Sequence, residues 1–115
     1  MLGTALVIFA IGALGGLALA SFVLRDRLAP WPLSMLHAAL GAIGLIIVLY
    51  AAFTAGISKA ALTALVILII AALGGFYLAS IHLGQKVAPK PVAFVHAGVA
   101  VIGFLTLLGA VFGAF

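Results

Sequence analysis

The sequence predicts an all-α fold: a polytopic membrane four-helix bundle made of two tandem, parallel-related helical hairpins. Of its 115 residues, 69% are apolar and only 5% are charged, whereas soluble domains are about 45–50% apolar and about 25% charged. So few charged side chains cannot cover a globule in water, which excludes a soluble domain. In addition, residues 4–56 align without a gap on residues 63–115, with 25 of 53 pairs identical.

Four apolar stretches are each long enough to cross the hydrocarbon core of a bilayer, which takes about 20 residues. We expect membrane helices at residues 3–24, 32–54, 60–83 and 91–114. Lipid offers no water to unpaired backbone groups, which favours helices over strands. The segment Ala18–Ala20 is A-x-A-like, but no Lys or Arg precedes it, so we expect a structural helix here rather than a cleaved signal peptide.

The repeat matches landmarks that a biased apolar composition does not explain. The matched pairs are Gly15-Gly16 with Gly74-Gly75, Pro30 with Pro89, Pro32 with Pro91, and His37 with His96. We divide the single membrane domain into a first hairpin, residues 1–56, and a second, residues 57–115. Because each hairpin crosses twice, a pseudo-two-fold axis along the membrane normal is expected, with matched residues at equal depth.

The distribution of basic residues predicts the orientation. The two loops inside the hairpins carry Arg25, Arg27, Lys86 and Lys90, whereas the opposite side carries Lys59. Positive charge collects on the cytoplasmic side. The sequence therefore predicts cytoplasmic hairpin loops, with both termini periplasmic or otherwise outside, in the cell inner membrane.

Several kinds of chemistry are excluded by what the chain lacks. Without cysteine there are no disulfides, thiolate metal sites or thiol nucleophiles. The single acidic residue, Asp26, excludes paired-carboxylate catalysis. The net charge of +4 comes from short loops without a basic stripe, which favours lipid headgroups over nucleic acid as the partner. No segment looks like an independent enzyme active site.

His37 and His96 are the candidate metal ligands. Each lies five residues after a helix-starting proline, roughly 7–8 Å below the helix start. An ionisable residue inside a membrane is by default a hypothesis of function, because lipid does not solvate it. Two imidazoles at one depth facing the central axis suit axial ligation of one haem iron. Hydrogen bonding between helices, chlorophyll magnesium or quinone contact, and a transport role are the alternatives. His82 is expected to be an interfacial polar residue.

Further residues are predicted to bind the cofactor. Small residues at helical spacing after the histidines leave a slot for the deep edge of a ring, and paired glycines let backbone approach its face, although such residues also mark plain helix contacts. These glycines are Gly41, Gly44, Gly103, Gly15, Gly16, Gly74 and Gly75. The loop cations Arg25, Arg27, Lys86 and Lys90 can neutralise propionates. Tyr77 could donate a hydrogen bond to a ligand or simply pack.

As an architecture, the whole chain resembles the small membrane-bound b-type cytochromes, including the haem-bearing anchor subunits of respiratory dehydrogenases. The resemblance implies that His37 and His96 are axial ligands of one haem b. It also implies electron transfer between a redox protein partner and the quinone pool, within or beside a respiratory complex. The protein is then a non-catalytic electron carrier rather than an enzyme. The alternatives are a cofactor-free accessory or scaffold subunit and a (bacterio)chlorophyll-binding membrane protein.

Overall fold

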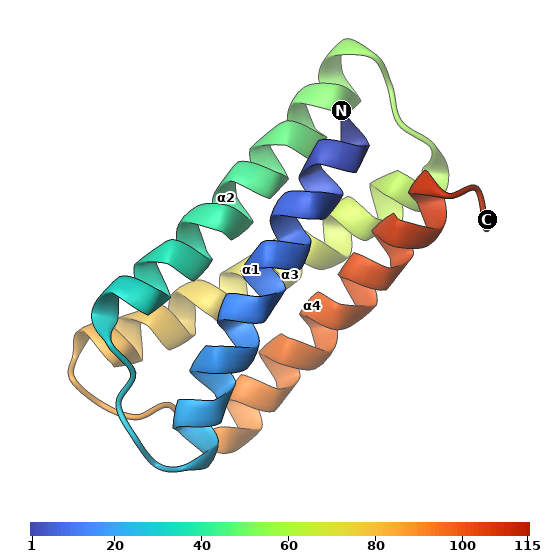
Figure 1. Ribbon diagram of the computed structural model, residues 1–115. Coiled ribbons are helices and arrows are strands. Elements are labelled where there is room, and N and C mark those ends of the chain that lie inside the picture. The colour runs from blue at the N-terminus through green and yellow to red at the C-terminus, as the bar shows by residue number, and fades with distance from the viewer.

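The computed structural model describes all 115 residues and contains four α-helices and no strand. The helices are α1 (Leu2–Leu24), α2 (Trp31–Thr54), α3 (Lys59–Leu83) and α4 (Lys90–Val111). Figure 1 shows them side by side in one elongated bundle. Each is long and apolar enough to cross a membrane. The predicted fold class is confirmed.

The helices form a closed ring of neighbours. Within the hairpins, α1 packs on α2 and α3 on α4; between them, α1 packs on α4 and α2 on α3. Helices α2 and α4 are therefore diagonally opposite. Both hairpin loops lie at one end, which we call the loop end, while both termini and the α2–α3 connection lie at the other, the terminal end (Figure 1). The bundle is 42 Å long, close to the about 40–45 Å of a whole bilayer.

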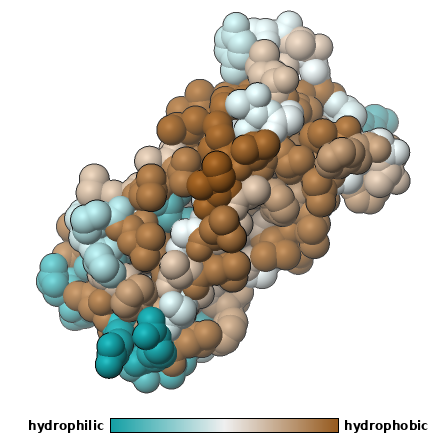
Figure 2. Space-filling view, in the orientation of Figure 1, coloured by the Kyte–Doolittle hydropathy of each residue, from teal (hydrophilic) through white to brown (hydrophobic).

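The outer surface of the bundle is apolar. Only 12 of 115 residues are buried, and large side chains such as Leu14 (68% exposed) and Phe53 (88% exposed) point outward. Figure 2 shows hydrophobic residues along the length of the bundle, with hydrophilic residues collected mainly at the loop end. A surface of this kind is stable only in lipid or detergent, and the chain is a multi-pass membrane protein.

The two hairpin loops begin with the same backbone motif. Asp26 and Gln85 have φ of 54° and 63°, directly after the C-caps of α1 and α3. The backbone amide of the next residue donates a hydrogen bond back to the last turn of the helix. These bonds run from Arg27 N to Phe22 O (2.9 Å) and from Lys86 N to Ile81 O (3.2 Å). This is the Schellman arrangement. It places two cations, Arg27 and Lys86, at matched positions at the loop end.

Helix α4 ends three residues before the predicted boundary, at Val111 rather than residue 114. Gly113 has φ of +72°, and the Ala114 amide donates to Gly109 O at 2.8 Å. A glycine in the left-handed region ends the helix, although the sequence beyond it stays apolar. Pro32 occupies the second position of its helix rather than the first, as does Pro91, where a missing N–H costs no hydrogen bond.

The hydrophobic core occupies the terminal half of the bundle. It consists of Ala5, Val48, Ala64, Leu65, Leu68 and Leu107. Two matched glycines bring the helices together beside this core. A Cβ at Gly44 would lie 2.6 Å from the ring of Phe9, and one at Gly103 would lie 2.8 Å from Leu68. The hydrophobic core thus lies in one half of the molecule.

Replacing Gly103 with alanine is expected to destabilise the bundle. The new methyl group overlaps Leu68 in the core, and overpacking costs about 1–3 kcal/mol, more than the about 0.5–1 kcal/mol that alanine gains over glycine in a helix. Gly98 in the same helix has no atom within 4 Å of its Cβ position, so Gly98→Ala is the matched control and should be neutral or stabilising. The free energy of unfolding in mixed micelles measures both, and equal values would contradict the packing described.

Candidate functional site

The loop half of the bundle contains a partly open cavity of about 550 Å³, lined mostly by apolar side chains from all four helices. Pockets for small molecules and cofactors typically measure about 300–1,000 Å³. The cavity runs from Phe9, Leu68 and Phe104, next to the core, to Arg27 and Lys86 in the hairpin loops. The space is therefore apolar in its depth and positively charged where it reaches the loop end.

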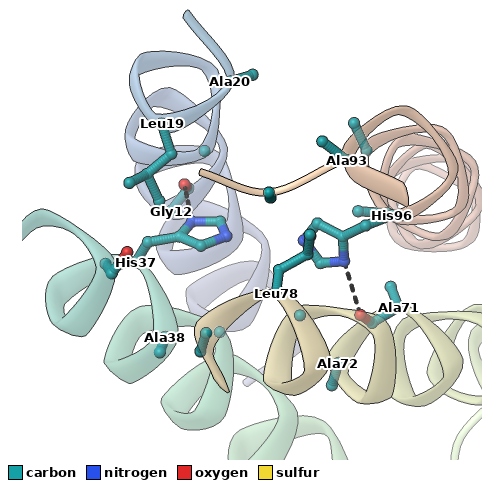
Figure 3. Close-up of a pocket in the computed structure, with 18 of the residues that line it drawn as sticks. Gly12, Leu19, Ala20, His37, Ala38, Ala71, Ala72, Leu78, Ala93 and His96 are labelled. Carbon is teal, nitrogen blue, oxygen red and sulfur yellow. Dashed lines mark hydrogen bonds between the residues drawn. The ribbon is translucent and has the colours of Figure 1, made fainter. Parts of the chain in front are cut away.

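His37 and His96 project into this cavity from the diagonal helices α2 and α4. The Nδ1 of His37 lies 2.8 Å from Gly12 O, and the Nδ1 of His96 lies 2.8 Å from Ala71 O (Figure 3). A carbonyl oxygen only accepts, so Nδ1–H is the donor in both bonds and Nε2 keeps its lone pair. Gly12 and Ala71 are matched positions of the repeat, so both hairpins orient their histidine in the same way.

The two imidazoles face each other across the cavity. Their ring centroids are 6.2 Å apart and their planes are at 89°, and in Figure 3 the nitrogens not bonded to a carbonyl point toward one another. With metal–nitrogen distances of about 2.0–2.1 Å, imidazoles on opposite sides of one metal have centroids about 6.3 Å apart. The observed spacing therefore suits one shared metal centre, with no third His, Cys, Asp or Glu beside the pair.

Two glycines make room for the rings. A Cβ at Gly16 would lie 2.9 Å from Cε1 of His37, and one at Gly75 would lie 3.0 Å from Cε1 of His96. At the neighbouring Gly15 and Gly74 the nearest atoms would be 3.8 and 3.6 Å away, which is ordinary contact. Sequence analysis predicted that these glycines let backbone approach a cofactor. In the structure Gly16 and Gly75 lie against the imidazoles and line the cavity, whereas Gly15 and Gly74 are not part of the lining.

Of the other three glycines predicted for the site, one lines the cavity and two do not. Gly41 lines the cavity and has open space at its Cβ position. Gly44 and Gly103 do not line it, because core side chains fill the space beside them. Tyr77 is 56% exposed and is also absent from the lining. Its hydroxyl therefore lies outside the cavity.

Of the four predicted loop cations, two lie at the cavity. Arg27 and Lys86 line it. The Arg25 guanidinium instead donates to a carbonyl of its own helix, 3.0 Å away, and Lys90 forms an ion pair with Asp26 at 3.3 Å. The cavity thus receives one cation from each hairpin, at matched positions.

His82 has a role that sequence analysis did not identify. It was expected to be an interfacial polar residue, but its Nε2–H donates to Ala29 O at 2.7 Å, and its Nδ1 accepts a hydrogen bond from the Ser34 hydroxyl. The ring also lies edge-on to Trp31, with centroids 5.1 Å apart. These partners all belong to the other hairpin. The only sequence signal was that the matched residue, Val23, is not a histidine.

No protein-family model, curated protein or solved structure matches this chain. Its class is defined by fold and site: a multi-pass membrane four-helix bundle whose loop half holds two facing histidines in an apolar cavity. The function is therefore inferred from the geometry of the cavity.

Proposed function

We propose that the protein is a b-type membrane cytochrome that transfers electrons, with His37 and His96 as the axial ligands of one haem. The observation that carries the proposal is the pair of facing imidazoles with centroids 6.2 Å apart. Each Nδ1–H donates to a backbone carbonyl. Histidines that bind a metal almost always donate their other ring N–H in this way, which fixes the tautomer and the direction of the lone pair.

The donor set and the cavity suit a haem better than a bare ion. Two imidazoles alone leave a metal ion short of ligands, whereas a tetrapyrrole contributes four nitrogens of its own. The apolar lining suits the body of the ring, and Arg27 and Lys86 suit its two carboxylates, because charge-assisted hydrogen bonds to carboxylates are strong. When bound, haem iron supplies one-electron exchange.

The chain itself holds the two Nε2 lone pairs in place through the Nδ1–H bonds to Gly12 O and Ala71 O. If His37 and His96 both held the iron, the chain would leave it no free position for a substrate, which favours an electron carrier over an enzyme. The 6.2 Å spacing also supports one shared metal over two separate chlorophylls, each of which would need its own ring beside its histidine. We propose a redox protein as partner and the quinone pool as electron donor or acceptor.

A visible spectrum of the protein purified in detergent tests the proposal. A sharp Soret band, with α and β bands on reduction and one haem per chain, is the expected result. A red-region band would indicate a chlorophyll-binding protein instead. A colourless preparation, from cells supplied with haem precursors and still colourless after haemin is added, would overturn the proposal in favour of a cofactor-free accessory or scaffold subunit.

We further propose that the loop end faces the cytoplasm and both termini face outward across the inner membrane. Because the chain has no cysteine, single substitutions report sidedness cleanly. Leu28→Cys and Val87→Cys should be protected from a membrane-impermeant maleimide in intact cells, whereas Ala55→Cys, which is exposed in the opposite connection, should react. The reverse labelling pattern would contradict the orientation, and labelling after permeabilisation controls for access.

A further inference from the structure

The two interfaces between the hairpins are built from matched positions of the repeat, but different side-chain contacts hold them together. One interface joins α2 to α3, and the other joins α1 to α4. Both border the cavity near the loop end. Differences between the two interfaces come from the positions at which the two repeats carry different residues.

The α2–α3 interface is closed by a polar cluster. His82 at the end of α3 donates to Ala29 O, accepts from Ser34 and lies edge-on to Trp31. We call His82, Ser34 and Trp31 the His82 cluster. Two hydrogen bonds and an aromatic contact cross the interface here, and breaking them in lipid would leave polar groups without partners. The cluster therefore keeps α3 attached to the first hairpin.

The α1–α4 interface has none of these residues. Val23 stands at the position of His82, Ala93 at that of Ser34, and Lys90 at that of Trp31. Its polar contact is the Lys90–Asp26 ion pair, whose side chains are 44% and 77% exposed. Exposed pairs of this kind contribute little to stability, so this interface opens at a much lower cost.

A second hollow, of about 210 Å³, lies in the α1–α4 interface, and seven of its eight lining residues are apolar. Five of the eight also line the main cavity: Leu17, Ala20, Val23, Ala93 and Ala97. Three of these five are alanines, which leave little side-chain contact between the helices. The hollow therefore lies directly between the cavity and the lipid.

We propose that the α1–α4 interface is the lateral access path through which a flat, amphipathic tetrapyrrole passes between the bilayer and the cavity. This inference rests on the proposed function for the identity of the ligand. A tetrapyrrole dissolved in lipid keeps its carboxylates at the headgroups and its apolar edge among the acyl chains. Moving sideways between α1 and α4 preserves that arrangement, with Arg27 and Lys86 taking over the carboxylates. A route through the loop end would instead carry the apolar edge past charged loops.

The test uses two matched double-cysteine variants, because the chain has no cysteine of its own. Val23→Cys with Ala93→Cys allows the α1–α4 interface to be closed by a short bifunctional thiol reagent. Ala79→Cys with Ala38→Cys, at the positions that match Ala20 and Ala97, allows the same at the α2–α3 interface and leaves the His82 cluster intact. Each protein is placed in phospholipid vesicles without haem, haemin is added, and the growth of the Soret band gives the loading rate.

Linking Val23→Cys to Ala93→Cys should slow loading by about 10-fold or more, since opening of this interface becomes the limiting step. Linking the α2–α3 pair should leave the rate within a factor of about two of its own unlinked form. Equal rates for linked and unlinked α1–α4 variants would overturn the access path. If no form takes up haemin, the proposed function fails instead.

Protein loaded first and linked afterwards checks that the link leaves the site intact. It should keep its spectrum but release haem to a haem-scavenging apoprotein about 10-fold more slowly than the unlinked form. Leu24→Trp, at a residue that lines the hollow but not the main cavity, should slow loading in the same way. Fast release from linked protein, or unchanged loading of Leu24→Trp, would each contradict the proposal.

Discussion

Replacing either His37 or His96 with alanine is expected to lower haem affinity by about 100-fold or more, because even the outer hydrogen-bond partners of metal-binding histidines are typically worth about 10–100-fold. The double variant should bind no haem. Either single variant that retains haem should lose the low-spin spectrum, because one axial position is left without a protein ligand. Pyridine haemochromogen content and optical titration with haemin measure both effects.

Two controls separate ligation from a structural role. Tyr77→Phe removes a polar group from the same half of the bundle, but one whose hydroxyl lies outside the cavity, and should leave the haem content unchanged. Free imidazole should restore the low-spin spectrum of His37→Ala and His96→Ala. If both single variants retain full haem content with an unchanged spectrum, the ligand assignment is wrong.

The second large effect is expected at Gly16 and Gly75. An alanine methyl at either position would lie only 2.9 or 3.0 Å from Cε1 of the facing histidine, so the ring must tilt and stretch its bond to the Gly12 or Ala71 carbonyl. Losing that bond should weaken haem binding by about 10-fold or more. Haemin titration of Gly16→Ala and Gly75→Ala measures the loss.

The adjacent glycines provide matched controls one residue away. At Gly15 and Gly74 the added methyl would meet its histidine at 3.8 and 3.6 Å, an ordinary contact that needs no movement of the ring. Alanine there should leave affinity unchanged and slightly stabilise the helix. If all four alanine variants bind haemin equally well, these glycines do not position the imidazoles.

Much of the fold could be predicted because it follows from long-range regularities of the sequence. Apolar length predicted the four helices, and the repeat predicted the hairpin pairing. Equal repeat positions also predicted that His37 and His96 lie at one depth. The early end of α4 was missed because a single backbone angle, at Gly113, decides it, and the surrounding hydropathy does not change there.

The candidate site was less predictable because it depends on contacts that leave little trace in the sequence. The acceptors for both histidines are backbone carbonyls, which every residue has. The roles of Gly16 and Gly75 depend on where a ring edge lies, since paired glycines equally suit a cofactor or a neighbouring helix. The His82 cluster joins residues from hairpins that differ at these positions, so the repeat could not reveal it.

The bundle is packed in its terminal half and hollow in its loop half. This difference determines how much of the membrane potential a charge crosses on its way to the histidines. The terminal half, packed around Val48 and Leu107, is a dry layer of low dielectric between the histidines and the far membrane surface. Carrying one elementary charge through the full potential costs about 2.3 kcal/mol per 100 mV, but a charge arriving from the loop end crosses only the first part of that drop. If the cavity holds the proposed haem, electron exchange should be one-sided: nearly insensitive to voltage at the loop face, and blocked by the packed half toward the terminal face.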